Sequence, residues 1–427
     1  MGSQNHRLAE TNCEPCIVEP AIRDLRSGKS SSMLQLERLR FGLILRGSVV
    51  AFRAMSDATE GPRYKLARER GRDSFSKRMT STPIDLRSDT VTQPTTSMRQ
   101  AIANAAVGDD VIETDPSVER LQDLCAEMLG MESAIFMPSG TMTNQIAIRI
   151  HCQPGDEFIC ESGCHIYNYE QAAFAQLSGV SARTVDGEFG VLHVDQLRDL
   201  IRPDNEHLVR TRLVCLENTH NRGAGRIQPY ESVLEICEWA KENGLRRHLD
   251  GARLFNAAVA TGIDLPDWAQ HFDTVSVCFS KGLGAPVGSA LAGPKELIKQ
   301  ARRARKLFGG GMRQAGIIAA GALYALEHHV DRLAEDHANA QVLADAVRQS
   351  EGLSLQPEIV DTNIVIFRVD PSMGSASQFV ESMREERVLA MATAPQLIRL
   401  VTHLDVNAEQ VARAGDVIKQ VAALLQE

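Results

Sequence analysis

The sequence has few aromatic residues and no apolar run long enough to cross a membrane. Aromatic residues make up 5% of the 427 residues, and the apolar stretch FGLILRGSVVAF is interrupted by an arginine. A membrane-spanning helix needs about 20 predominantly apolar residues. With 43% hydrophobic and 24% charged residues, the composition is instead typical of a globular protein. We therefore expect no membrane association.

A cysteine framework is also lacking. The nine cysteines are scattered, and Cys125, Cys215 and Cys278 stand within apolar runs, as free buried thiols do. Cys13 and Cys16 form a lone CxxC pair without a second ligand pair, so no metal site is predicted. The cysteine pattern favours a reducing compartment, and we expect the protein to be cytoplasmic.

Positive charge is in excess only in residues 1–83, which contain 15 Lys and Arg against nine Asp and Glu, while the whole chain has a net charge of −9. The remainder is strongly acidic, which argues against nucleic acid or an anionic membrane as a partner of the main domains. We predict that residues 1–83 are a basic, disordered N-terminal extension. Met79, directly ahead of TSTPIDLRSDT, is an alternative first residue.

From Ile84 onward, helical patterns alternate with short β-rich runs, namely SAIFM, EFIC, RLVCLEN, RRHLD and TVSVCFS. This alternation predicts an α/β fold whose large domain, residues 84–325, has a mostly parallel sheet with helices on both faces. A long amphipathic pattern from Glu327 to Ser350 is followed by TNIVIFRV and RLVTHL. We interpret residues 326–427 as a smaller C-terminal α+β domain.

Lys281 and Asp250 each follow a predicted buried strand, and glycines 282, 284 and 288 come shortly after the lysine. Ligands in open α/β sheets bind at the carboxyl ends of the strands, so both side chains could reach one crevice. A partly buried lysine amine can attack an aldehyde, and an aspartate can keep a pyridine nitrogen protonated. Taken singly, Lys281 could be a surface lysine and Asp250 a helix N-cap.

Candidate functional residues stand at three further places, two of them possible anion sites. In FMPSGTMTNQ, Gly140 and Thr141 open a helix, whose free N–H groups favour a phosphate, although a plain capped helix fits equally well. Arg399 stands among apolar neighbours in QLIRLVTH, where a buried guanidinium needs either a carboxylate ligand or an ordinary ion pair. His165 follows the strand EFIC, where it could act as an acid or base or be only a satisfied polar residue.

Together these segments resemble the L-threonine aldolases of the low-specificity type, in the β-eliminating lyase family of the aspartate-aminotransferase fold class. The resemblance runs from Ile84 to nearly the C-terminus and excludes residues 1–83. Its strings are IDLRSDTVTQPT, VGDDV, PSGTMTNQ, the His165 segment ESGCHIYNYE, ENTHN, HLDGARLFNA, SKGLGAPVGS, KLFGGGMRQAG and RLVTHLDV. It implies a fold type I enzyme that uses pyridoxal 5′-phosphate (PLP) to cleave L-threonine or L-allo-threonine to glycine and acetaldehyde.

The resemblance also assigns cofactor contacts. It implies that Lys281 forms the Schiff base with PLP, that Asp250 pairs with the pyridine nitrogen, and that His165 stacks on the ring. Gly140 and Thr141 match the phosphate-binding turn.

Substrate contacts follow in the same way. Arg253 lies where the family contacts the cofactor's phenolic oxygen and the substrate carboxylate, and Ser88 and Arg399 are the other expected carboxylate contacts. Arg313 is expected to reach the phosphate from a neighbouring subunit, which implies a homodimer or homotetramer with shared active sites. His207, in the looser motif RPDNEHLVRTRL, matches the family's second active-site histidine.

Several alternatives stay open. Either His165 or His207 could be the base that takes the proton of the substrate hydroxyl. Asn168, in HIYNYE, stands where the family often has an aromatic residue bordering the side-chain pocket, so the preference among β-hydroxy amino acids is undetermined. Another β-eliminating amino-acid lyase of the same fold, or a catalytically silent relative that acts as a cofactor-binding scaffold, are the competing functions.

Overall fold

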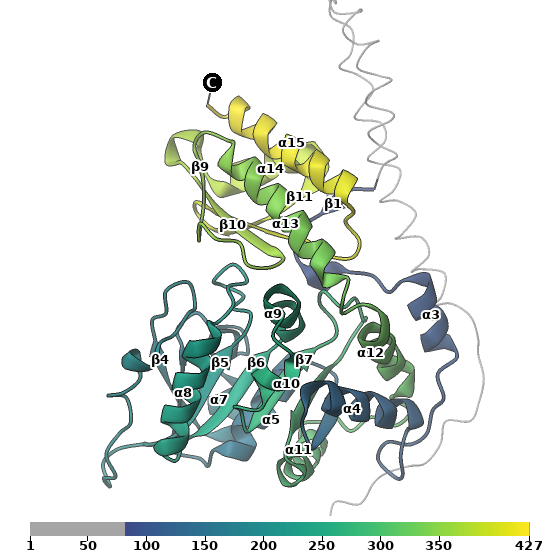
Figure 1. Cartoon of the computed structure of the whole chain (residues 1–427), viewed down its shortest axis with the longest axis vertical. Helices are drawn as coiled ribbons and strands as arrows, with labels where there is room; N and C mark the ends of the chain where they lie inside the picture. Colours follow the sequence, from purple (N-terminus) through teal and green to yellow (C-terminus); the bar gives the residue numbers. More distant parts are fainter. Residues whose placement is uncertain (1–81, 427) are drawn as a thin grey trace, which may run out of the picture. The chain divides into compact units, whose positions relative to one another are not determined.

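The structure is a computed structural model, and it describes residues 82–426. These residues form one compact unit, and its largest sheet has seven strands (Figure 1). Residues 1–81 of the predicted N-terminal extension, with Cys13, Cys16 and Met79, lie outside the described residues. The sheet contains β2 (Ser133–Met137), β3 (Asp156–Glu161), β4 (Ser181–Val185), β5 (Arg210–Glu217), β6 (Arg246–Gly251), β7 (Thr274–Cys278) and β8 (Ser289–Gly293).

The strand order is β2-β8-β7-β6-β5-β3-β4, and every neighbouring pair is parallel except the two that β8 makes. The five β-rich runs of the sequence coincide with β2, β3, β5, β6 and β7, so the prediction of a mostly parallel α/β sheet is confirmed. Within these runs, RLVCL and VSVCF are apolar at nearly every position because both faces of the sheet are covered.

Alternate side chains of a strand enter different apolar clusters. On β2, Phe136 joins one cluster and Ile135 another, and on β5 the same separation holds for Val214 and Leu213. This period of two is the geometry of a pleated strand. Helices therefore have to cover both faces.

The first face is covered mainly by α4 (Pro116–Leu129), α8 (Tyr230–Glu242), α9 (Leu254–Thr261), α10 (Leu265–Ala269) and α12 (Gly316–His328). The second is covered by α5 (Gly140–His151), α6 (His165–Asn168), α7 (Ala173–Ser178) and α11 (Lys295–Leu307). The helix α3 (Thr96–Ala103) packs on α12. The two helical layers bury the parallel strands as the sequence predicts.

The C-terminal region has its own sheet, in the order β12-β13-β10-β9, with all neighbours antiparallel. Its strands are β9 (Leu353–Leu355), β10 (Ile364–Val369), β12 (Met391–Ala394) and β13 (Leu397–Val401). The helices α13 (Leu333–Arg348), α14 (Ala376–Glu385) and α15 (Ala408–Leu424) share one apolar cluster with these strands. Figure 1 shows this second layered region, coloured green to yellow.

Two details differ from the sequence interpretation. The amphipathic pattern from Glu327 to Ser350 is not one helix, because α12 ends at His328 and α13 begins at Leu333. The first strand, β1 (Ile84–Asp85), pairs with β11 (Val388–Leu389) of the C-terminal region, so the start of the predicted large domain adds a strand to the small one. The boundary at residues 325 and 326 stays a prediction.

Seven cysteines lie among the described residues, and all are free and buried, as predicted for Cys125, Cys215 and Cys278. Burial raises the pKa of Cys125 to about 12 and raises the pKa of Cys215 and Cys278. Within residues 82–426, no helix is both long enough and apolar enough to pass through a membrane.

Candidate active site

Three neighbouring strands end in carboxylates at the same edge of the large sheet. They are Glu161 on β3, Glu217 on β5 and Asp250 on β6, and the segment after β7 carries Lys281. The carboxyl ends of parallel strands meet at one edge, where ligands bind. The structure therefore brings Lys281 and Asp250 to a common edge, as the sequence spacing suggested.

Asp250 is almost fully buried and makes two hydrogen bonds. Its Oδ1 accepts from the Ala252 N–H at 3.1 Å, and its Oδ2 accepts from Asn144 Nδ2 at 2.8 Å. A carboxylate has about four lone-pair sites, so these two bonds leave room for one more donor. Asp250 can accept a hydrogen bond from a protonated ring nitrogen.

A second buried carboxylate, Glu170, connects Asp250 to His165. Asn144 Nδ2 donates to Glu170 Oε1 at 2.9 Å as well as to Asp250, and Gln145 Nε2 donates to Glu170 Oε2 at 2.5 Å. His165 Nδ1 lies 2.8 Å from Glu170 Oε1. Because Glu170 is an acceptor, it places the Nδ1 proton on His165 and leaves Nε2 free to accept or donate.

His165 has a raised pKa, although burial by itself would lower it. Its hydrogen bond to Glu170 and the negative charges of Asp250, Glu170 and Glu217 favour the protonated ring and outweigh the burial. The backbone N–H of His165 also donates to Glu217 Oε2 at 2.6 Å, which fixes the start of α6. His165 is thus a positioned imidazole that can exchange a proton.

The side chains of His165, Glu170 and Asp250 offer ligand atoms that lie within 4.8 Å of one another. Such a group could hold a cation. Here the Asn144 amide donates to both carboxylates, and His165 donates to one of them. Proton donors thus already occupy the space between these ligand atoms.

Lys281 is half-buried, and within residues 82–426 its ammonium has no hydrogen-bond or ion-pair partner. Its positive charge lowers the pKa of Asp89 and partly offsets the burial that raises the pKa of Cys278, so it lies near both groups. The turn after it is held by a hydrogen bond from Gly284 N–H to the Lys281 carbonyl at 2.8 Å. Gly284 has a φ of 75°, a conformation that favours glycine.

The N-terminus of α5 lies beside the same edge. Ser139 caps the helix and accepts from Met142 N–H, while Gly140 and Thr141 form the first turn, whose N–H groups have no helical acceptor. A Cβ at Gly140 would lie 2.7 Å from Cys278 Sγ, so only glycine fits against the end of β7. These N–H groups and the Thr141 hydroxyl suit a phosphate.

The residues present therefore fit PLP. Lys281 offers an amine without a competing carboxylate, Asp250 offers a buried acceptor for the ring nitrogen, and His165 offers a ring held in place by Glu170. Gly140 and Thr141 offer the phosphate turn at the start of α5.

Arg253 belongs to a buried ion pair. Its Nε and Nη2 donate to the two oxygens of Asp89 at 2.7 and 2.8 Å, and both side chains are almost inaccessible to solvent. Although burial raises the pKa of Asp89, the charge and hydrogen bond of Arg253 outweigh it and lower that pKa to about 2. The third nitrogen, Nη1, lies 3.4 Å from Asn221 Oδ1.

Arg399 reaches the same asparagine but has no carboxylate partner among the described residues. Its Nη1 donates to Asn221 Oδ1 at 3.3 Å and its Nη2 to the Arg87 carbonyl at 3.2 Å, while its buried Nε has no partner. Burial and the charge of Arg253 lower the pKa of Arg399. A half-buried guanidinium of this kind can bind a ligand carboxylate bidentately.

Ser88 lies next to these groups, between Arg87 and Asp89. It caps the short 3-10 helix η1 (Asp89–Val91), and its Oγ accepts from the N–H and hydroxyl of Thr90. The hydroxyl proton of Ser88 is still available to a ligand. The structure thus joins Arg253 and Arg399 at Asn221, and Ser88 directly precedes Asp89, the partner of Arg253.

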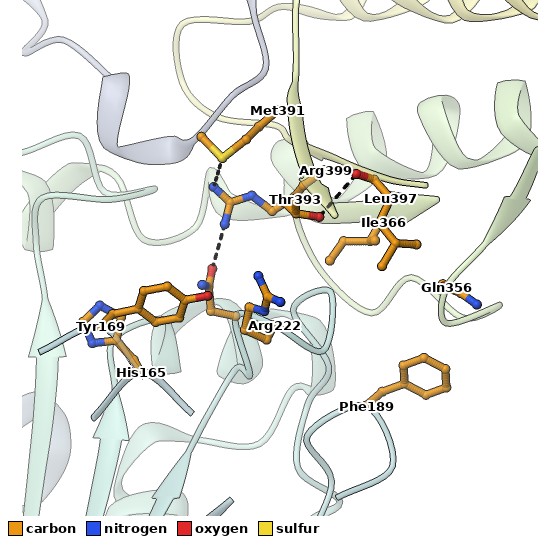
Figure 2. Close-up of a pocket in the computed structure, with 11 residues that line it drawn as sticks. His165, Tyr169, Phe189, Arg222, Gln356, Ile366, Met391, Thr393, Leu397 and Arg399 are labelled. Atoms are coloured by element: carbon orange, nitrogen blue, oxygen red, sulfur yellow. Dashed lines mark hydrogen bonds between the residues drawn. The ribbon is translucent and has the colours of Figure 1, made fainter. Parts of the chain in front are cut away.

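A cavity of about 510 Å³ opens in front of Arg399 and His165. Figure 2 shows its wall, which is lined by His165, Tyr169, Phe189, Asn221, Arg222, Gln356, Ile366, Met391, Thr393, Leu397 and Arg399. The expectation that Asn168 borders this pocket is wrong. Its side chain instead donates to the Ser162 and Cys164 carbonyls, and the next residue, Tyr169, faces the cavity beside His165.

Two predicted residues do not join this group within one chain. The side chain of His207 is 81% exposed and precedes β5, whereas the active-site edge lies beyond the end of β5 at Glu217. A strand rises about 3.3 Å per residue, so His207 is roughly 25 Å from that edge. Arg313 is also exposed, and its Nη1 pairs with Asp109 Oδ2 at 3.1 Å.

Five functional candidates escaped the sequence interpretation, namely Asp89, Asn144, Glu170, Glu217 and Asn221. All five lie inside strings that the resemblance had already singled out: LRSD, TMTNQ, HIYNYE and ENTHN. The only sequence signal for these residues was their place within those strings. The strings do not show which partner each polar residue contacts, because each partner is distant in sequence.

Comparison with known proteins agrees with the site. Residues 85–370 match the family model described as beta-eliminating lyase. The low specificity L-threonine aldolase of Escherichia coli strain K12 is 45% identical over 333 residues, which cover 78% of this chain and 97% of that protein.

Two solved structures share the fold. A putative L-allo-threonine aldolase from Listeria monocytogenes superposes with a TM-score of 0.69 at 22% identity, covering 83% of this chain and 99% of that one. A structure described as SPT with a PLP internal aldimine has a TM-score of 0.63 at 19% identity, and the match covers 80% of this chain and 88% of that one. The predicted fold type I architecture is confirmed, and the chain belongs to the beta-eliminating lyase family, among relatives named low-specificity L-threonine aldolase.

Proposed function

We propose that the protein cleaves L-threonine, L-allo-threonine or both to glycine and acetaldehyde, using PLP held by Lys281, Asp250, His165, Gly140 and Thr141. The observation that carries the proposal is Arg399, a half-buried guanidinium without a carboxylate partner among the described residues, beside the positioned imidazole of His165. An amino-acid substrate supplies the missing carboxylate. Its side chain then faces the cavity.

Arg399 binds the substrate carboxylate, with Ser88 and Arg253 as the neighbouring donors. Arg253 keeps its own charge paired with Asp89, so it contributes mainly through Nη1. Fixing the carboxylate also fixes which bond to Cα breaks, because the reacting groups are held in one orientation. This positioning selects cleavage of Cα–Cβ.

Bound PLP would supply an electron sink for the pair left by the broken Cα–Cβ bond, and Asp250 would hold the protonated ring nitrogen. His165 takes the proton of the β-hydroxyl at Nε2, and the β-carbon leaves as the aldehyde. A proton then returns to Cα, which yields glycine. Glu170 supports this role because it holds Nδ1 and stabilises the protonated imidazole.

The test is incubation of the purified protein and PLP with L-threonine, L-allo-threonine and their D-forms. We expect stoichiometric glycine and acetaldehyde from an L-substrate. Pyruvate and ammonia would instead support a different β-eliminating lyase. Bound cofactor without turnover of any β-hydroxy amino acid would support the silent scaffold.

We also propose that the protein forms a homodimer or homotetramer in which Arg313 contacts the cofactor phosphate of a neighbouring copy. Support comes from its exposure and from the apolar surface near it. Its carbonyl accepts from Asp110 N–H, and the adjoining loop exposes Val111 and Ile112. An exposed apolar surface of this kind is typical of an interface. Sedimentation analysis of the wild-type protein and an Ile112→Asp variant tests it.

A further inference from the structure

The cavity wall carries a second arginine that the proposed threonine reaction does not use. Arg222 lies in the segment 218–229 between β5 and α8, next to Asn221, and lines the cavity together with Arg399. It is exposed, and its guanidinium has no hydrogen bond or ion pair within residues 82–426. In Figure 2 it is drawn below Arg399, between the His165–Tyr169 rings and Phe189.

The backbone on both sides of Arg222 is held in place. Asn221 N–H donates to Glu217 Oε1 at 2.9 Å, and Gly223 N–H donates to His220 Nδ1 at 3.0 Å. His220 is itself buried against Glu161, with Nε2 and Oε2 2.8 Å apart. Arg222 therefore projects from a fixed backbone at the cavity wall rather than from a free loop.

The charges around the cavity are unbalanced. Its lining contains two arginines and no aspartate or glutamate. The buried acid Asp89 is already paired with Arg253, and Glu217 accepts from the backbone N–H groups of His165 and Asn221. The charge of Arg222 contributes to the lowered pKa of Arg399. One substrate α-carboxylate can satisfy Arg399. Arg222 is exposed and lacks an ion pair within residues 82–426, so it is free to bind a second anion.

The cavity also has room for a substituent larger than the methyl group of threonine. Its volume of about 510 Å³ lies within the range of roughly 300–1,000 Å³ that is typical of small-molecule sites. A methyl group fills only a small part of that volume. A substituent that ends in a carboxylate could extend toward Arg222 while Arg399 holds the α-carboxylate.

We propose that Arg222 is a specificity-determining residue that binds an acidic group on the β-carbon, so that the site also cleaves β-hydroxy amino acids whose side chain ends in a carboxylate. This inference rests on the proposed aldol cleavage. With 3-hydroxyaspartate, the Cα–Cβ bond breaks, the hydroxyl proton passes to the base, and the β-carbon leaves as the aldehyde carbon of glyoxylate. Cα gains a proton and becomes glycine, so no oxidant or reductant is required.

The experiment compares kcat/KM for 3-hydroxyaspartate, and for 3-hydroxyglutamate as a longer acid, with kcat/KM for L-threonine in the holoenzyme. The variants are Arg222→Met, which keeps the length, and Arg222→Lys, which keeps the charge. Arg303→Met is the matched control, because Arg303 is also exposed and without a partner within residues 82–426, but lies on α11 outside the cavity. Glycine and the aldehyde product are both quantified.

We expect the wild-type protein to cleave at least one acidic substrate. Arg222→Met should lower the acid-to-threonine ratio of kcat/KM about tenfold, because a charge-assisted hydrogen bond is lost. Arg222→Lys should restore most of the ratio, and Arg303→Met should leave it unchanged. Threonine cleavage without cleavage of either acid overturns the inference and leaves the proposed function intact, whereas no cleavage of any substrate overturns the proposed function.

A binding measurement separates specific contact from general attraction of anions. L-Aspartate and L-2-aminobutyrate lack the β-hydroxyl, so neither can be cleaved, and calorimetry gives their affinities. Arg222→Met should weaken the binding of aspartate about tenfold more than the binding of 2-aminobutyrate. Equal losses of affinity for the two ligands would mean that Arg222 acts only through its long-range electrostatic field, which overturns the assignment.

Discussion

The cofactor side and the substrate side of the site satisfy their charges differently. On the cofactor side, Asp250 and Glu170 are buried, and Asn144 donates to both. On the substrate side, Arg399 and Arg222 face a cavity without any carboxylate partner among the described residues. The chain thus supplies its own partners where a permanent cofactor is to be oriented. It leaves positive charge unpaired where a transient anionic substrate binds.

The largest expected effect is the loss of turnover in Lys281→Ala. Lys281 is the one cofactor-side residue whose charge has no partner among the described residues. Lys281 has no partner of its own within residues 82–426, so Lys281→Ala should leave the thermal midpoint of the apoprotein nearly unchanged. Turnover should fall by about 10⁴-fold or more, because the covalent attachment of the cofactor is lost. Absorption spectroscopy after PLP addition and desalting checks it. A variant that retains both the visible absorption and turnover would refute the assignment.

A substitution at Asp89 tests the ion pair between Asp89 and Arg253 directly. Asp89→Asn leaves Arg253 buried without a carboxylate, and we expect a loss of about 3–5 kcal/mol in the free energy of unfolding. The folded-state pKa of Asp89, about 2, lies below its ordinary value of 3.8. Its stabilisation is therefore present above about pH 4 and is lost as the pH falls towards 2.

Urea unfolding between pH 2 and 7 measures this contribution. The free energy of unfolding of the wild-type protein should fall as the pH approaches 2. In Asp89→Asn this fall should be smaller, because the contribution of the Asp89 carboxylate is already absent. If the two proteins showed parallel pH profiles, the ion pair would not be the source.

Unlike Asp89→Asn, the substitution Arg399→Met should not lower the stability of the protein. Removing a half-buried cation without a carboxylate partner should leave the thermal midpoint as high as in the wild-type protein or higher. The KM for threonine should nevertheless rise about 10–100-fold, since a charge-assisted contact with the carboxylate is lost. Steady-state kinetics and calorimetry check both parts. A large loss of stability would show that Arg399 is structural.

Glu170→Gln should shift the pH dependence of turnover. Glu170 raises the pKa of His165, so its neutral replacement should lower that pKa. If His165 acts as the base, the acidic limb of the kcat/KM profile should then move to lower pH. Glu161→Gln is the matched control, because Glu161 is paired with a different buried histidine, His220. A limb that moves equally in both variants would not support the role of His165.

The smallest effect is expected for His207→Asn. The side chain of His207 is 81% exposed, so the free energy of unfolding should change by less than about 0.5 kcal/mol. Within one chain His207 is far from the site, and turnover should stay near that of the wild-type protein. A strong loss of turnover with unchanged stability would mean that His207 reaches the active site of another copy.

Part of the fold could not be read from the sequence. The strand β8 is the run SALAG, whose small residues carry little β signal, yet it lies between β2 and β7 and pairs with both. The break between α12 and α13 falls at residues 329–332, which contain neither glycine nor proline. There His329 Nδ1 contacts the Leu283 carbonyl at 2.7 Å, a contact from a distant segment.

The sequence by itself determined five strands of the large sheet, the family and the residues at the ends of those strands, because these depend on local periodicity and on contiguous strings. Only the tertiary structure decided which charges are paired. Arg253 meets Asp89 across 164 positions and Arg399 meets Asn221 across 178, while Arg222 meets no acid within residues 82–426. The physical reason is that a charge is satisfied by its neighbours in space, and the fold, not the spacing along the chain, chooses them.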